Sequence, residues 1–373
     1  MYDTIIIGLG AMGSATAFHH AKRGARVLGL DRFHPPHAHG SSHGRSRIIR
    51  QAYFEHPLYV PLVQRAYTLW AELEVAAGRA LFARTGGLML GRDDSAVVQG
   101  ALQSARDHAL AHELLDHAAL ARRFPMFRTG RDTVALWEPN AGALDPEACV
   151  ASHLALASAA GATLRYGEAA RTWSRTRDGV AVQTSTGRYT ARRLIVTAGA
   201  WTSAFLGDHA PRLQVERAVQ LWFEPLRNAE MFQPERMPLF IWEHAPGVAW
   251  YGIPSVSHGM KLALHHTGQY ASADEVSRTV LDSDIAPVRR LVQQGLPDAD
   301  GALRESAVCL YTNTADEHFL IDTLADAPEV LVVSACSGHG FKFSSAIGEL
   351  LADMALDGAS TFDITPFRMQ RLA

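Results

Sequence analysis

Three glycines near the start of the chain have the spacing of a phosphate-binding turn. Gly8, Gly10 and Gly13 follow an apolar run at residues 4–7 and open a segment with helical periodicity. A second apolar run then ends on Asp31. Strand, glycines, helix, strand and acid follow one another in the order of a βαβ unit that holds a dinucleotide.

Each of these residues has a physical role in such a unit. Gly8 permits the tight turn, Gly10 lets the backbone approach a pyrophosphate, and Gly13 lets helix and strand pack closely. The free N–H groups at the helix N-terminus attract the phosphates, and Asp31 can accept hydrogen bonds from the ribose hydroxyls. The unit by itself does not distinguish NAD from FAD.

A polar segment at residues 32–56 follows the unit, and its prolines and glycines indicate a loop. Long loops in compact domains are often functional. Its closely spaced histidines could mark a metal site, but no carboxylate or cysteine joins them at ligand spacing. We therefore expect no metal and interpret the segment as a loop over an anionic cofactor; for Arg45 alone we favour a solvated side chain. The basic residues before Gln51 are His34, His37, His39, His43, Arg32, Arg45, Arg47 and Arg50.

Composition narrows the class of protein. The 373 residues suit two domains. A net charge of −3 argues against a nucleic-acid or anionic-membrane partner. No apolar run reaches the ~18 residues of a membrane span, and the first strand leaves no room for a signal peptide. Three widely spaced cysteines fit a reducing cytoplasm.

Further along the chain, the periodicity predicts the elements that must position these residues. We expect helices at residues 57–78, 145–161 (with Asp145 as N-cap), 275–294 and 343–356, and two short helices within 93–124 that break near residues 114–116. We expect strands within 81–91, 133–142, 215–223, 248–266 and 330–334, and an antiparallel meander at 163–188.

A buried strand at residues 194–196 ends on Thr197, Ala198 and Gly199, shortly before Trp201. A second strand that ends on small residues is common in FAD-binding Rossmann domains, where the backbone passes close to the cofactor. We therefore expect an α/β fold (α+β overall) with a discontinuous FAD-binding domain at residues 1–83, 146–214 and 316–373. Residues 84–145 and 215–315 would form a second domain with a mixed or antiparallel sheet that contacts the substrate.

Several motifs in order resemble those of the monomeric sarcosine oxidase and N-methyltryptophan oxidase family of FAD-dependent amine oxidases. They are GLGAMGS (8–14), HGSSHGRSRIIRQAY (39–53), YGIPS (251–255), MKLALHHTGQ (260–269), CLYTNTADEHFLID (309–322) and SGHGFKFSSAIGEL (337–350). The resemblance covers essentially the whole chain. It implies cofactor contacts from Ser14, Arg32, Ser41, Ser42, Gly338, Gly340 and Lys342, in addition to the residues named above.

The resemblance also implies a covalent bond between the cofactor and the chain. The matching position for a thioether to the flavin 8α carbon is Cys309. From the residues alone, an ordinary buried thiol is the favoured interpretation of Cys309. Cys149 and Cys336 are expected to be structural.

Paired cations are needed to bind the carboxylate of an N-methyl amino acid. The resemblance places Arg50 and Lys342 in this role. A lysine at a helix start is unfavourable beside the helix dipole, so a bound anion explains Lys342 better than a structural role does.

A lysine in an otherwise apolar strand, Lys261, matches the family's lysine for reaction with O₂, because a fixed cation stabilises the superoxide that forms. A solvent-facing lysine on an amphipathic strand is the alternative. His265, Tyr251 and Tyr311 match residues of the substrate pocket. His43 and Arg47 match residues beside the flavin. The chain departs from its relatives at Ser42 and Arg45, where histidine and aspartate are frequent.

The activity implied is oxidative N-demethylation of sarcosine or another N-methyl amino acid by a monomeric enzyme. O₂ is the electron acceptor, and the products are formaldehyde, a primary amino acid and H₂O₂. The alternatives are an oxidase of N-methyltryptophan or of a cyclic imino acid such as pipecolate or proline, an NAD-dependent dehydrogenase, and a flavin-binding subunit without its own substrate. A dehydrogenase would leave Lys261, Cys309 and the 337–342 glycine loop unexplained.

Overall fold

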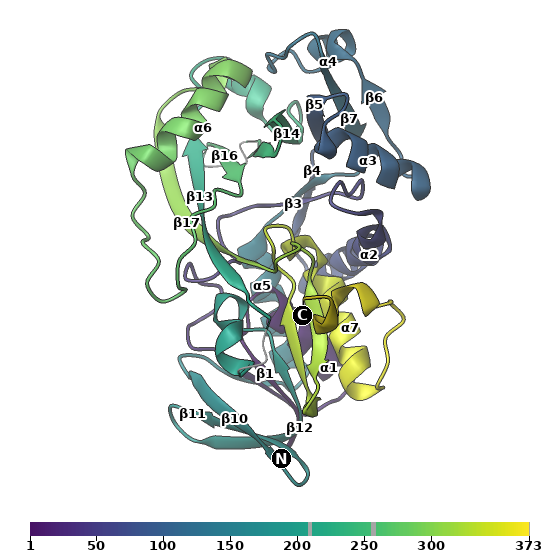
Figure 1. Ribbon diagram of the computed structural model, residues 1–373, viewed down its shortest axis with the longest axis vertical. Coiled ribbons are helices and arrows are strands. Elements are labelled where there is room, and N and C mark those ends of the chain that lie inside the picture. Colours follow the sequence, from purple (N-terminus) through teal and green to yellow (C-terminus); the bar gives the residue numbers. More distant parts are fainter. Residues whose placement is uncertain (208–210, 255–258, 373) are drawn as a thin grey trace.

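The computed structural model describes residues 1–207, 211–254 and 259–372. Two large sheets lie at opposite ends of an elongated molecule, and helices pack between and beside them (Figure 1). The α/β fold class is confirmed. No helix among the described residues is long and apolar enough to cross a lipid bilayer.

The first sheet contains the dinucleotide-binding unit. β1 pairs in parallel with β2 on one side and with β12 on the other, and β19 continues the parallel sheet beyond β12. The four core residues of β1 are buried, as expected for a parallel sheet covered on both faces. The elements are β1 (Tyr2–Ile7), α1 (Ala11–Lys22), β2 (Val27–Leu30), β9 (Thr163–Arg165), β10 (Ala170–Thr176), β11 (Gly179–Thr184), β12 (Arg188–Val196), β18 (Leu320–Leu324) and β19 (Ala327–Ser334).

Helices cover the first sheet and bring distant segments together. The bounds are α2 (Val60–Ala77), α5 (Pro146–Ala159) and α7 (Ser344–Leu356), and α1 packs against both α5 and α7. Asp145 caps α5 as predicted, because its Oδ1 accepts a hydrogen bond from the Ala148 N–H at 2.8 Å. The first, middle and last parts of the chain therefore build one unit.

Three sequence predictions need correction. β9 pairs in parallel with β2, so the antiparallel meander contains only β10–β12. The break between the helices α3 (Ala96–Asp107) and α4 (His117–Arg123) is a strand, β6 (Glu113–Leu115), which pairs with β7 (Thr133–Glu138). The helix predicted at residues 275–294 begins only at Asp282, as α6 (Asp282–Gly295); the preceding backbone is held by the Arg217 guanidinium, which donates to the carbonyl oxygens of Ser277 and Thr279.

The second sheet has eight strands in the order β17-β13-β16-β15-β14-β5-β7-β6. Their bounds are β5 (Gly87–Arg92), β13 (Gln214–Phe223), β14 (Leu239–Ala245), β15 (Val248–Ile253), β16 (Met260–His265) and β17 (Leu303–Asn313). A small sheet of β3 (Arg47–Ile49), β8 (Gly142–Leu144) and β4 (Phe82–Arg84) lies apart from both. We propose the domain boundaries given above; the small sheet takes strands from both sides of them.

The substitution Gly13→Ala is expected to destabilise the fold. A Cβ at this position would lie 1.8 Å from the Gly8 carbonyl oxygen, so the helix could not stay against the turn. A loss of about 2 kcal/mol or more is expected, in the range of overpacking in a tight core. Thermal unfolding measures it, with Gly187→Ala as control, because that Cβ would meet no atom within 4 Å. Equal unfolding temperatures of the two variants would contradict the packing role of Gly13.

Candidate active site

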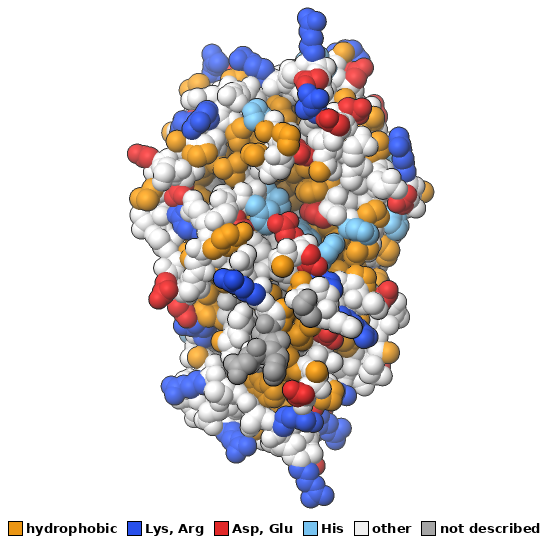
Figure 2. Space-filling view, viewed as in Figure 1, with side chains coloured by type: hydrophobic (Ala, Val, Ile, Leu, Met, Phe, Trp, Pro, Cys, Tyr) orange, Lys and Arg blue, Asp and Glu red, His pale blue; other side chains and the backbone are white. Residues whose placement is uncertain are grey.

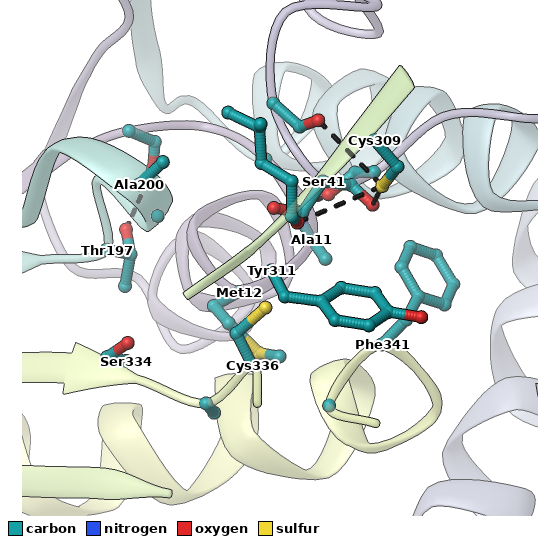
Figure 3. A pocket seen from close by; sticks show the side chains of 18 of the residues that line it. Ala11, Met12, Ser41, Thr197, Ala200, Cys309, Tyr311, Ser334, Cys336 and Phe341 are labelled. Carbon is teal, nitrogen blue, oxygen red and sulfur yellow. Dashed lines mark hydrogen bonds between the residues drawn. The ribbon is translucent and has the colours of Figure 1, made fainter. Parts of the chain in front are cut away.

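One cavity of about 390 Å³ connects the two sheets, a volume within the usual range for ligand pockets. Its lining begins at the N-terminus of α1 with Gly10, Ala11 and Met12 and extends to Lys261 and Lys342. Figure 3 shows Cys309, Tyr311, Cys336 and Phe341 around the same space. On the face drawn in Figure 2, hydrophobic side chains surround a hollow and histidines gather beside it.

The glycine turn fits a dinucleotide. Gly8 has a φ of +90°, and a Cβ there would lie 2.5 Å from the carbonyl oxygen of Thr197. Asp31 is buried at the same end, where its carboxylate accepts hydrogen bonds from the Leu9 and Phe33 N–H groups at 2.7 and 2.8 Å. Burial raises the pKa of Asp31, and these two bonds oppose that effect. The turn and the acid are therefore set in place before any ligand arrives.

The other residues predicted to contact the cofactor divide into two groups. Ser41, Ser42, Ala198, Gly199, Trp201, Gly338 and Gly340 line the cavity with Arg32. Ser14 and Gly13 are not among the residues that line it: the Ser14 hydroxyl donates to the Ala11 carbonyl oxygen at 3.2 Å inside the helix. Ser42 Oγ accepts a hydrogen bond from the Ala11 N–H at 3.1 Å, so it already occupies one donor of the helix N-terminus.

A salt bridge that the sequence did not reveal closes the same end of the cavity. Asp274 accepts from Arg32 Nη1 at 2.9 Å and from Trp201 Nε1 at 2.8 Å. The Arg32 guanidinium also lies over the Trp201 ring at 5.2 Å. Asp274 lies in the connection between β16 and β17 of the second sheet, so these two bonds hold that connection against the nucleotide end of the cavity.

Cys309 lies on β17, and its thiol faces the loop at residues 40–47. Arg47 Nη2 lies 3.3 Å from the sulfur and 2.7 Å from the Ser41 carbonyl oxygen. The sulfur is 3.5 Å from the same carbonyl oxygen. Arg47 therefore fixes both the loop and the thiol, and its side chain lines the cavity.

Lys261 is buried, with 2% of its surface exposed, so the solvent-facing alternative was wrong. Its ammonium donates to the carbonyl oxygens of Gly44 and Ser46 at 2.9 and 2.8 Å. Burial, and secondarily Arg47, lower its pKa well below the usual value. His43 is close to this group but does not line the cavity; burial and then Arg47 lower its pKa to about 4, and its Nε2 has no partner among the described residues.

Arg50 and Lys342 line the opposite part of the cavity, together with Glu55, which the sequence reasoning missed. Arg50 Nη2 donates to the Glu55 carboxylate at 2.5 and 2.7 Å. Burial would raise the pKa of Glu55, but Arg50, together with His339 and Lys342, outweighs burial and the pKa falls to about 2. Burial and then Arg50 lower the pKa of Lys342 to about 7.

Aromatic side chains and His265 form the remaining wall. Tyr251, Tyr311 and His265, which the resemblance assigns to the substrate pocket, all line the cavity. Burial lowers the pKa of His265 to about 3, so its ring is neutral. The His266 ring, 4.3 Å from that of His265, was not predicted, and its Nδ1 donates to buried Glu216 at 2.9 Å. Burial by itself would lower the pKa of His266, but the hydrogen bond to Glu216, together with the charges of Glu317, Glu216 and Glu55, raises it.

The lysine count is a signal that could have identified two cavity residues directly. The chain has three lysines, and two of them, Lys261 and Lys342, line the cavity. Arginine supplies nearly all other cations. The compact, strongly hydrated ammonium of lysine is thus concentrated at the cavity.

A dinucleotide cradle joined to a cavity with two buried lysines, arginines and a thiol defines a flavin-dependent oxidoreductase. Residues 3–354 match the family described as FAD dependent oxidoreductase, and the chain belongs to that family. It is 45% identical to a monomeric sarcosine oxidase of Streptomyces avermitilis, over 100% of this chain and 98% of the relative. It is 37% identical to an N-methyl-L-tryptophan oxidase of Salmonella enteritidis, over 100% and 99%. The resemblance found in the sequence is confirmed.

A solved structure supports the fold independently. The open form of NikD, an unusual amino acid oxidase essential for nikkomycin biosynthesis, is 25% identical, with a TM-score of 0.86 over 98% of this chain and 97% of that chain. The L-proline dehydrogenase of P. horikoshii has the same TM-score at 18% identity and supports the fold alone.

Proposed function

We propose that the protein is a flavoprotein oxidase that demethylates sarcosine or another small N-methyl amino acid. One water and one O₂ are consumed for each formaldehyde, primary amino acid and H₂O₂ released. The observation that supports this most is the pair of buried cations, Arg50 and Lys342, in the cavity that also contains Lys261 and Cys309. The higher identity to sarcosine oxidase than to N-methyltryptophan oxidase favours the smaller substrate.

The substrate carboxylate would bind between Arg50 and Lys342 through charge-assisted hydrogen bonds. Arg50 already holds Glu55, so the substrate carboxylate must share the guanidinium with it or displace it. An anion beside Lys342 favours its charged form and raises its pKa again. The secondary amine must be neutral when it reacts, and the cations around the cavity with restricted water lower its pKa.

When bound, FAD would supply the redox chemistry, as two-electron acceptor for the oxidation of the N-methyl carbon and as electron donor to O₂. The chain supplies the surroundings for this chemistry. Asp31 and the glycine turn would hold the nucleotide, with Ser41, Ser42, Gly338 and Gly340 along the cavity. His265, Tyr251 and Tyr311 would enclose the substrate. Lys261, with Arg47 beside it and the neutral His43 ring nearby, would provide the positive potential at which O₂ is reduced.

A peroxide-coupled assay tests the function. Sarcosine, N-methyltryptophan, pipecolate and proline are offered separately to the purified holoenzyme, and H₂O₂ and formaldehyde are measured. Peroxide and formaldehyde in equal amounts, with the highest kcat/KM for sarcosine or another small N-methyl amino acid, are expected. Peroxide without formaldehyde, from a cyclic imino acid alone, would reject N-demethylation. A yellow protein that forms no peroxide with any of the four would reject the oxidase itself.

We further propose that FAD is attached through a thioether to Cys309. Arg47 Nη2 lies 3.3 Å from the sulfur and holds the thiol at the wall of the cavity in which the flavin would bind. In the Cys309→Ala variant, acid precipitation is expected to release the flavin into the supernatant, whereas in the wild type the flavin stays with the pellet. Cys336→Ala is the matched control, because that thiol also lines the cavity. Free flavin from the precipitated wild type would refute the linkage.

We also propose an oligomeric state and a cellular compartment for the protein. The sarcosine oxidase relatives are named as monomeric, and we propose the same state for this chain. The three cysteines are free, which is consistent with action in the reducing cytoplasm.

A further inference from the structure

Lys342 is held by a chain of buried hydrogen bonds that extends away from the cavity. Its ammonium donates to the His339 carbonyl oxygen at 2.6 Å and to the Tyr53 hydroxyl at 3.4 Å. Tyr53 Oη lies 2.6 Å from His339 Nδ1, and His339 Nε2 lies 3.0 Å from the Glu317 carbonyl oxygen. Tyr53, His339 and Lys342 are all buried.

The direction of each bond follows from the chemistry of the groups. A carbonyl oxygen only accepts, so His339 Nε2 carries the proton and donates it to Glu317. Burial lowers the pKa of His339 to about 4, so the ring is neutral and Nδ1 must accept. Tyr53 therefore donates its single proton to Nδ1, and its oxygen is left to accept from Lys342.

The backbone supports the same arrangement. Glu317 has a φ of +59°, a left-handed conformation that is unusual for a residue other than glycine, and its carbonyl oxygen is the one that His339 meets. The Tyr53 ring also lies under the Arg50 guanidinium at 4.2 Å and near the Lys342 ammonium at 5.1 Å. A single tyrosine thus contacts both cations of the proposed carboxylate site.

We propose that Tyr53 and His339 are positioning residues that orient the Lys342 ammonium toward a bound carboxylate. Two of its three protons have acceptors among the described residues, and the third is left for an anion in the cavity. The inference rests on the proposed function, because it assigns these residues to the carboxylate site of that enzyme. Tyr53 and His339 are not catalytic residues in this proposal, because neither needs to contact the reacting carbon.

The substitution Tyr53→Phe tests the proposal, because it removes the hydroxyl and keeps the ring over Arg50. The probe is methoxyacetate, an isostere of sarcosine that has an ether oxygen and no titrating amine. Its dissociation constant is measured on the holoenzyme from the change in flavin absorbance. We expect binding to weaken about tenfold, as for loss of a hydrogen bond to a charged group.

The matched control is Tyr59→Phe. Tyr59 Oη lies 2.8 Å from His318 Nδ1, and its ring packs 5.0 Å from that of Tyr53, but no hydrogen bond joins it to Lys342. We expect the control to bind methoxyacetate within about twofold of wild type. Conservative replacement gives a second comparison: His339→Asn, which can present an acceptor to Tyr53, should bind more tightly than His339→Leu.

The pH dependence of binding separates orientation from general damage. The groups that face the ammonium are Arg50, Glu55, Tyr53 and His339. Glu55 and His339, with pKa values of about 2 and 4, titrate below the measured range of pH 6 to 9, and the arginine stays charged. Affinity for the anion falls as Lys342 loses its proton. Because loss of the Tyr53 oxygen destabilises the ammonium, this fall should begin at lower pH in Tyr53→Phe.

Equal affinity and an equal pH profile for Tyr53→Phe and Tyr59→Phe would overturn the positioning role while sarcosine turnover by the wild type still stood. Failure of the wild type both to bind methoxyacetate and to oxidise any N-methyl amino acid would overturn the proposed function, and this inference with it.

Discussion

Replacement of Lys261 with methionine is expected to slow the reaction of the reduced enzyme with O₂ by about 10²–10³-fold, the usual effect of removing one preorganised electrostatic group. Lys261 is buried beside Arg47, and its ammonium is fixed by two carbonyl oxygens. Methionine has similar length but no charge. The measurement is the rate of flavin reoxidation after anaerobic reduction and mixing with oxygenated buffer.

The anaerobic rate of flavin reduction by substrate provides the internal control. It should change much less, because substrate binding depends on Arg50 and Lys342. Lys22→Met, at the exposed remaining lysine, should change neither rate. If Lys261→Met reoxidises as fast as wild type, the lysine has no part in oxygen reduction; if both half-reactions collapse together, the loss of the bonds to Gly44 and Ser46 is structural.

Replacement of Arg50 with methionine is expected to lower kcat/KM for an N-methyl amino acid by about 10²–10³-fold, the range for loss of one partner of a buried ion pair. The variant loses a partner for the substrate carboxylate and also leaves Glu55 without its cation. The pKa of Glu55 should then rise from about 2, yet above this new pKa its charge repels an anionic substrate. Steady-state kinetics from pH 5 to 9 measure the effect.

A second substitution separates the two causes. In Arg50→Met/Glu55→Gln the repulsion is absent, so part of kcat/KM should return, mainly through a lower KM. Arg45→Met is the matched control, because Arg45 belongs to the same loop and pairs with Glu305 at 2.6 Å. If the Arg50→Met variant had the KM of the wild type, Arg50 would not bind the substrate carboxylate.

The nucleotide-binding half could be predicted from the sequence because its signal is local. A single βαβ unit contains the spaced glycines, the two apolar runs and the acid. The glycines predict the tight turn, the apolar runs predict the two strands, and the acid marks the end of the second strand. The prediction failed for β9 because alternation describes a strand but does not say which neighbour it joins: residues 163–165 pair across the chain with β2.

The active-site predictions came mostly from family resemblance, and the structure adds the partners that no spacing reveals. Glu55 and His266 each depend on a partner that only the folded chain reveals. Glu55 accepts a hydrogen bond from Arg50 on its own loop, and His266 donates one to Glu216 on β13. Ser42 was recognised as unusual, but its bond to the Ala11 N–H depends on how the loop crosses the helix N-terminus. Side-chain contacts within a loop or between distant segments are not encoded in periodicity.

Because the first sheet is built from early and late segments of the chain, its topology has a consequence for folding during synthesis. β1 and α1 emerge first from the ribosome, but β19 and α7, which flank β12 and α1, are synthesised last. Lys342 and the glycine loop before it lie in that late segment. The nucleotide-binding unit of the nascent chain therefore stays incomplete until residues 327–356 are synthesised. Binding of the cofactor is expected to follow translation.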